Sequence, residues 1–179
     1  MACRPTIAAA LLSAVAALAG CSREAREERL AARADADFAA GRYDRAEVEY
    51  GAALELAPDL RATGNLGILY SDEGRTLQAY PYLKRAADEG PERADVRVKL
   101  GLALLEFGGA NGARESAKRA LAADPANEEA LLLLGASSQT RGEAEDTRRL
   151  VDGLRRTHPD CSGYHLVLGR LLLAAGRKA

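Results

Sequence analysis

The sequence predicts an all-α fold, a right-handed superhelical solenoid of antiparallel helix pairs, and two observations lead to this prediction. Leu-Gly pairs recur at one constant spacing, at Leu66-Gly67, Leu100-Gly101, Leu134-Gly135 and Leu168-Gly169. No segment shows the strict alternation of apolar and polar residues that is typical of a β-strand. A fixed period of this length indicates stacked helical units, each of which contacts only its neighbours.

Glycines and prolines keep the same phase and predict where the helices end. A glycine can adopt the left-handed conformation that stops a helix, so Gly41, Gly74, Gly108 and Gly142 are expected between the two helices of a unit. A proline excludes the preceding residue from the helical region, so Pro58, Pro91, Pro125 and Pro159 are expected to follow the second helix. The predicted helices span 23–40, 44–57, 60–73, 76–90, 94–107, 110–123, 127–140, 143–157 and 161–176.

Small residues within the helices are expected to let the two helices of one unit approach closely. Gly67, Gly101 and Gly135 follow the leucine of each pair, where a Cβ atom would push two backbones apart. Pro81 is the one proline out of phase with the repeat. We expect it in the opening turn of its helix, where the missing N–H costs little.

The segment 1–20 has the layout of a secretory signal peptide. Arg4 and the amino terminus supply positive charge, an uncharged, mostly apolar run extends from Thr6 to Leu18, and small residues follow. The run is shorter than the roughly 20 apolar residues that a membrane-spanning helix needs. The sequence therefore predicts a signal peptide over 1–20 and a helical solenoid over 21–179.

The end of this segment, Leu18-Ala19-Gly20-Cys21, resembles the lipobox of bacterial lipoproteins. The resemblance implies that Cys21 receives the lipid and becomes the new amino terminus. It also implies a bacterial cell envelope location on the periplasmic side, and Ser22 favours the outer membrane. An ordinary signal peptide followed by a chance cysteine is the alternative.

The repeated residues also resemble the tetratricopeptide repeat, whose units carry Leu-Gly and Tyr in the first helix and Ala and Pro in the second. The unit with Leu66-Gly67, Tyr70, Ala79 and Pro91 matches this pattern well. The resemblance covers nearly all of 21–179, as four repeats plus a half repeat. It implies a scaffold for protein–protein interactions rather than an enzyme.

In that family the first helices of successive units line a concave groove. Carried over to this chain, the resemblance predicts a mostly apolar groove suited to an amphipathic helix or an extended apolar peptide. Packing between helices is the alternative for each residue. Only Asn65 and Lys99 match the family's clamp for a terminal carboxylate, so we do not expect that ligand. The predicted groove residues are Ile68, Val98, Leu102, Leu105, Leu132, Leu166 and Arg170.

Composition and motifs argue against several functions. The chain has 25 basic and 26 acidic residues, so it lacks the basic surface of a nucleic-acid-binding protein. No glycine-rich phosphate loop and no catalytic constellation is recognisable, so we expect no cofactor, no metal and no small-molecule substrate. His158, Cys161 and His165 lie close in sequence, which leaves a thiol- or metal-dependent periplasmic enzyme centred on Cys161 as an alternative.

The last predicted helix, 161–176, is apolar on nearly every face, whereas the final unit of a solenoid normally shows a polar outer side. We expect either a second subunit or a further helix to cover it. The predicted function is a membrane-anchored scaffold in an envelope system. Similar lipoproteins serve pilus secretin assembly, outer-membrane protein assembly or exopolysaccharide export. A passive spacer is a further alternative.

Overall fold

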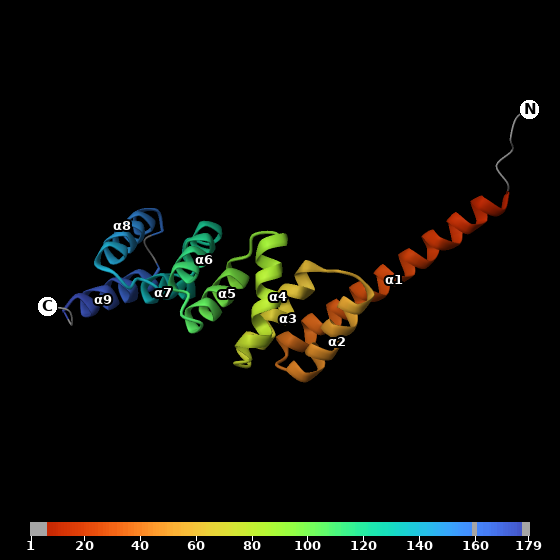
Figure 1. Ribbon diagram of the computed structural model, residues 1–179, viewed down its shortest axis with the longest axis horizontal. Coiled ribbons are helices and arrows are strands. Elements are labelled where there is room, and N and C mark those ends of the chain that lie inside the picture. Colours follow the sequence, from red (N-terminus) through yellow and green to blue (C-terminus); the bar gives the residue numbers. More distant parts are fainter. Residues whose placement is uncertain (1–6, 159–160, 177–179) are drawn as a thin grey trace, which may run out of the picture. The chain divides into compact units, whose positions relative to one another are not determined.

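The computed structural model describes residues 7–158 and 161–176, and these residues form nine α-helices and no strand (Figure 1). The all-α prediction is confirmed. The helices are α1 (Ile7–Ala39), α2 (Tyr43–Leu56), α3 (Leu60–Asp72), α4 (Thr76–Glu89), α5 (Ala94–Glu106), α6 (Ala110–Ala123), α7 (Glu128–Ala136), α8 (Arg141–Thr157) and α9 (Gly163–Gly176).

Contacts divide the chain into two compact units, Met1–Leu66 and Gly67–Ala179. In the first unit α1 packs along α2, and their contact is made of small residues and one tyrosine. Ala31 and Ala34 of α1 are buried, as are Ala46, Tyr50 and Ala53 of α2. Alanines at helical spacing allow the two helices to approach closely, and this explains the compact pairing.

In the second unit, helices that follow one another along the chain lie side by side (Figure 1). Helix α5 packs against α4, α6 and α7, and α9 packs against α7 and α8. One continuous core joins α5 to α9, with alanines on α6 facing leucines on α7. Its fully buried large side chains include Val98, Leu131, Leu133, Leu134, Val151, Tyr164 and Val167.

The glycine and proline signals are largely confirmed. Gly41, Gly74 and Gly108 lie between helices with φ of +71°, +73° and +81°, in the left-handed region that favours glycine. The residues that precede Pro58, Pro91 and Pro125 are extended, with φ of −150°, −93° and −138°. Pro159 lies outside the described residues.

The prediction for Gly142 was wrong, because this glycine lies in the first turn of α8 and has no positive φ. Helix α7 ends at Ala136, four residues before the predicted end. The hydroxyls of Ser137 and Ser138 each donate to the carbonyl of Leu134, at 3.0 and 2.9 Å, and so satisfy a carbonyl near the helix end.

Helix α8 then starts with a capping box. The side chain of Thr140 accepts a hydrogen bond from the Glu143 backbone N–H at 3.2 Å, and the Glu143 carboxylate accepts one from the Thr140 backbone at 2.8 Å. Hydroxyl side chains therefore determine the connection between α7 and α8. In the earlier repeats a glycine in the left-handed region occupies the equivalent connection.

Pro81 is the sixth residue of α4, so the prediction that it lies in the opening turn was wrong. The predicted close approach of the two helices of one unit is confirmed at Gly67, where a Cβ atom would lie 2.9 Å from Cγ of Leu83 on the paired helix α4. At Gly135 the nearest atom belongs instead to Val167 of α9, at 3.3 Å. The small residue here serves contact between successive units.

Helix α1 begins at Ile7, well before the predicted start at residue 23, and runs continuously past the predicted cleavage position. The side chain of Cys21 lies outside the described side chains. Among the described residues, none of the helices combines the length and the apolar character needed to cross a membrane. The signal peptide and the lipid anchor remain predictions.

Candidate functional site

The predicted groove residues lie on α3, α5, α7 and α9. Leu102 of α5 is 42% exposed, Leu132 of α7 is 39% exposed and Leu166 of α9 is 56% exposed. Arg170 is also exposed, and Leu105 is half-buried. Helix α5 packs on α7, and α7 packs on α9. The exposed leucines therefore lie on the first helices of three successive repeats.

Ile68 and Val98 differ from the other predicted groove residues because both are buried, with 7% and 1% of their surface exposed. Val98 belongs to the core that joins α5 to α9. These two residues therefore pack between helices, which was the alternative to a position in the groove. The exposed part of the predicted wall therefore consists of Leu102, Leu105, Leu132, Leu166 and Arg170, and we call this set the first-helix wall.

Close helix packing positions this wall. A Cβ atom at Gly101 would overlap Leu133 of α7 and would lie 3.1 Å from Cβ of Ser116. A Cβ atom at Gly135 would lie 3.8 Å from Cδ of Arg170. The glycines thus bring α5, α7 and α9 into direct contact and hold their outward-facing leucines on one framework.

Lys99 of α5 forms ion pairs with carboxylates on two other helices, α3 and α7. The Lys99 ammonium lies 3.0 Å from Asp72 and 3.8 Å from Glu129. Partial burial lowers the pKa of Lys99, but the hydrogen bond and the attraction to these carboxylates outweigh it and raise the pKa above its ordinary value. Lys99 is therefore a cation that already has its counter-ions.

In the first unit, Asp35 of α1 accepts hydrogen bonds from three side chains. The hydroxyl of Tyr50 lies 2.6 Å away, the amide of Asn65 lies 2.8 Å away, and Arg61 forms an ion pair. Burial raises the pKa of Asp35, but these hydrogen bonds outweigh it and lower the pKa below its ordinary value. One carboxylate thereby ties α1, α2 and the start of α3 together.

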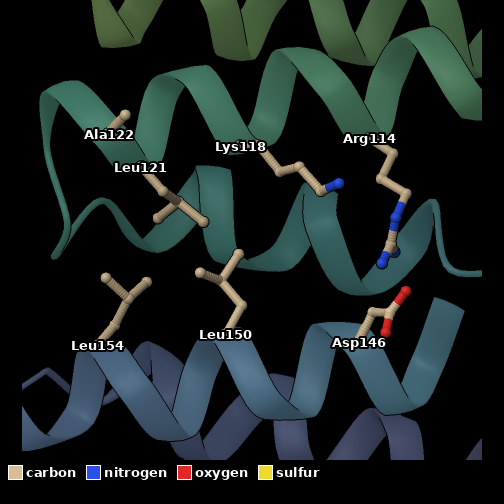
Figure 2. A pocket seen from close by; sticks show the side chains of 7 residues that line it. All are labelled: Arg114, Lys118, Leu121, Ala122, Asp146, Leu150 and Leu154. Carbon is tan, nitrogen blue, oxygen red and sulfur yellow. The ribbon is translucent and has the colours of Figure 1, made fainter.

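A second surface feature, which the sequence analysis missed, is a groove between α6 and α8 with a volume of about 420 Å³. Figure 2 shows Leu121, Leu150 and Leu154 facing one another across it at one end, and Arg114 and Asp146 at the other. The available sequence signal was the i, i+4 pair Leu150 and Leu154 within an otherwise highly charged helix. Its lining also includes Lys118 and Ala122.

Arg114 is a buried cation at one end of the α6–α8 groove, with 7% of its surface exposed. Its guanidinium donates to the hydroxyls of Ser138 and Thr147, at 2.7 and 2.8 Å, and to the carbonyl of Glu143 at 2.9 Å. All three acceptors are neutral oxygens, so the positive charge of Arg114 is hydrogen-bonded without a directly contacting carboxylate.

The sulfur of Cys161 lies 3.4 Å from the backbone carbonyl of Ala126, and the Nδ1 of His158 lies 2.9 Å from the hydroxyl of Thr157. Among the described residues, no three His, Cys, Asp or Glu side chains are grouped so that they could hold a metal ion. The contact with Ala126 shows that Cys161 lies against the backbone that precedes α7.

Comparisons with known proteins agree with this architecture. Residues 104–171 match the tetratricopeptide repeat family model. No curated protein matches the sequence.

Solved structures share the fold at low sequence identity. MamA has a TM-score of 0.69 and 20% identity, over 84% of this chain and 83% of MamA. A tetratricopeptide repeat protein from Parabacteroides merdae has a TM-score of 0.69 and 17% identity, over 85% of this chain and 61% of that protein. YrrB, described as having an unusual peptide-binding site, has a TM-score of 0.62 and 18% identity, over 76% of this chain and 71% of YrrB.

Two independent kinds of observation agree on the fold. The helical pairs, the glycine contacts between them and the solved neighbours define the fold, while the family model matches the sequence of its later units. This fold supports a role as a scaffold for protein–protein interactions. The chain therefore has the all-α solenoid fold of tetratricopeptide repeat proteins, and its residues 104–171 match the sequence model of that family.

Proposed function

We propose that this protein is a lipid-anchored scaffold of the bacterial envelope whose first-helix wall holds a protein partner close to the membrane. The observation that carries the proposal is the exposure of Leu102, Leu132 and Leu166 on three neighbouring helices. Isolated exposed leucines are common on protein surfaces, but apolar side chains gathered on adjacent elements are typical of an interaction surface.

The partner segment is an amphipathic helix or an extended apolar peptide. The wall offers leucine side chains along its length and one cation, Arg170, on α9. Such a surface favours a segment with apolar residues on one face, because it has few charged groups that could pair with polar residues of the partner. The description of the structurally similar YrrB as a peptide-binding protein supports a peptide as the class of partner.

The anchor is the lipid on Cys21. The support for it is the sequence Leu18-Ala19-Gly20-Cys21, which closes the uncharged, mostly apolar run that begins at Thr6. In this proposal the anchored solenoid lies on the periplasmic side of the outer membrane, where it serves an assembly or export system for a pilus secretin, an outer-membrane protein or an exopolysaccharide.

The test replaces wall leucines in the full-length tagged chain. Leu102→Glu and Leu132→Glu together should remove one defined protein from the set that copurifies from solubilised membranes, because they bring two charges into an apolar contact. Arg119→Glu, on an exposed face of α6, is the control and should keep that protein. If wild type and the double variant retain the same proteins in the same amounts, the first-helix wall is not the binding surface.

A further inference from the structure

We infer that the α6–α8 groove is a second docking site, which binds a short segment of another protein that combines acidic and apolar side chains. This surface is separate from the first-helix wall, because α6 and α8 are the second helices of their units whereas the wall lies on the first helices. The inference therefore goes beyond the proposed function and does not depend on it.

The groove has the dimensions of a peptide site. Its lining on α6 runs from Arg114 to Ala122, and its lining on α8 runs from Asp146 to Leu154. With a rise of about 1.5 Å per residue, each edge is about 12 Å long, or slightly more than two helical turns. A volume of about 420 Å³ suffices for several apolar side chains, so the partner's side chains enter the groove while its backbone stays outside.

One end of the groove is apolar and the other is positive. Leu121 is nearly fully buried, and Leu150 and Leu154 are half-buried opposite it (Figure 2). At the positive end, Lys118 is exposed and has no hydrogen-bond or ion-pair partner among the described residues. Its Nζ points into the groove in Figure 2.

The two basic side chains of the lining lack a carboxylate in direct contact. Arg114 is hydrogen-bonded only to neutral oxygens, and Asp146, the one carboxylate of the lining, already pairs with Arg149. The lining therefore has two cations, Arg114 and Lys118, that no directly contacting carboxylate neutralises. Charge complementarity consequently favours an acidic side chain on the partner, placed next to Lys118.

The spacing of the lining residues defines the partner segment further. Lys118 and Leu121 are three residues apart on α6, and Asp146 and Leu150 are four residues apart on α8. A helical partner that follows this groove would therefore present an Asp or Glu one turn from a Leu, Ile or Phe, with a second apolar residue one turn further.

The experiment selects a phage-displayed library of short random peptides on the full-length chain and measures the affinity of the enriched peptides. We expect peptides with the acidic–apolar pattern, whose binding weakens about tenfold with Lys118→Glu, as is typical of a lost close charge pair. Leu154→Ser should also weaken binding, whereas Arg155→Glu, on α8 outside the lining, should not.

A charge exchange separates a specific contact from damage to the fold. Replacing the acidic residue of the peptide by lysine should restore binding to Lys118→Glu, which no unfolded variant would allow. Leu102→Glu should leave the affinity unchanged, so that failure of this site and failure of the first-helix wall give different results.

Three results of the peptide experiment would overturn the inference. They are the absence of any enriched peptide, binding that is insensitive to Lys118→Glu, and binding that only Leu102→Glu abolishes. Self-association of the wild type in sedimentation that Lys118→Glu removes would also overturn it, because a second copy of the chain would then occupy the groove.

Discussion

The guanidinium of Arg114 donates a hydrogen bond to the hydroxyl of Thr147 at 2.8 Å and thereby joins α6 to α8. Both residues are buried, and Ser138 adds a hydroxyl that lies 2.8 Å from that of Thr147. This polar contact lies beside the alanine- and leucine-rich core of the same helices. It links the second helices of two successive repeats, α6 and α8.

Arg114→Ala should lower the free energy of unfolding by about 2–3 kcal/mol, because the buried hydroxyl of Thr147, the half-buried hydroxyl of Ser138 and a carbonyl lose their donor. Arg114→Lys should recover only part of this loss, since an ammonium lacks the planar fork that reaches several acceptors. Arg119→Ala, on the exposed face of α6, is the control and should change stability by about 0.5 kcal/mol or less. Equal effects in urea denaturation for Arg114→Ala and Arg119→Ala would contradict the role of this contact.

Two equivalent glycines should respond oppositely to alanine. Gly101→Ala would place a methyl group against Leu133 and Ser116, so it should destabilise the protein by about 1–3 kcal/mol. At Gly169 the added Cβ atom meets no described atom within 4 Å, so Gly169→Ala should be neutral or stabilising by up to about 1 kcal/mol. Thermal unfolding of the two variants measures this, and a loss of stability at both positions would refute the assigned packing.

The Asp35 network predicts acid sensitivity of the first unit. Because the folded-state pKa of Asp35 lies below its ordinary value of 3.8, the ionised form contributes stability at neutral pH. That contribution is complete above about pH 5 and disappears as the pH falls through 3.8 to the lower folded-state pKa. Asp35→Asn should therefore be less stable than wild type at pH 7 and should approach it in acid. A stability difference that stays constant with pH would show that the charge is not involved.

Lipidation can be measured without knowing the partner. If Cys21 carries the lipid, the mature protein should enter the detergent-rich phase in a detergent phase-partition experiment. The Cys21→Ser variant should remain in the aqueous phase. Cys161→Ser is the matched control, because Cys161 is a half-buried free cysteine far along the chain from the predicted lipid site, and it should partition like the wild type. Recovery of Cys21→Ser in the detergent phase would reject the lipid anchor.

Much of the architecture follows from the sequence, because the Leu-Gly period fixes the helix order and the helix positions to within a few residues in most units. The exceptions arise from side chains that act locally. Helix α7 ends early because Ser137 and Ser138 bond back to the Leu134 carbonyl, and Thr140 starts a new helix two residues later. At this connection the helix ends are therefore set by serine and threonine side chains, and not by a left-handed glycine as the repeat predicted.

Burial was harder to predict than position. Val98, Leu132 and Leu166 occupy equivalent places in three successive units, yet their exposed fractions rise from 1% to 39% and 56%. Arg114 shows the converse, a charged residue that is buried with hydrogen-bond partners on α8 and on the connection between α7 and α8. The period assigns each residue to a helix, whereas its exposure depends on neighbours that the period alone does not specify.

The central claim is that the first-helix wall contacts a protein partner, and site-specific photocrosslinking in the native host tests it most directly. The photoreactive residue replaces Leu102 in one strain and Arg119 in a control strain. We predict an adduct of one defined mass from position 102 and none of that mass from position 119. Equal adducts from both positions, or no adduct from either, would contradict the claim.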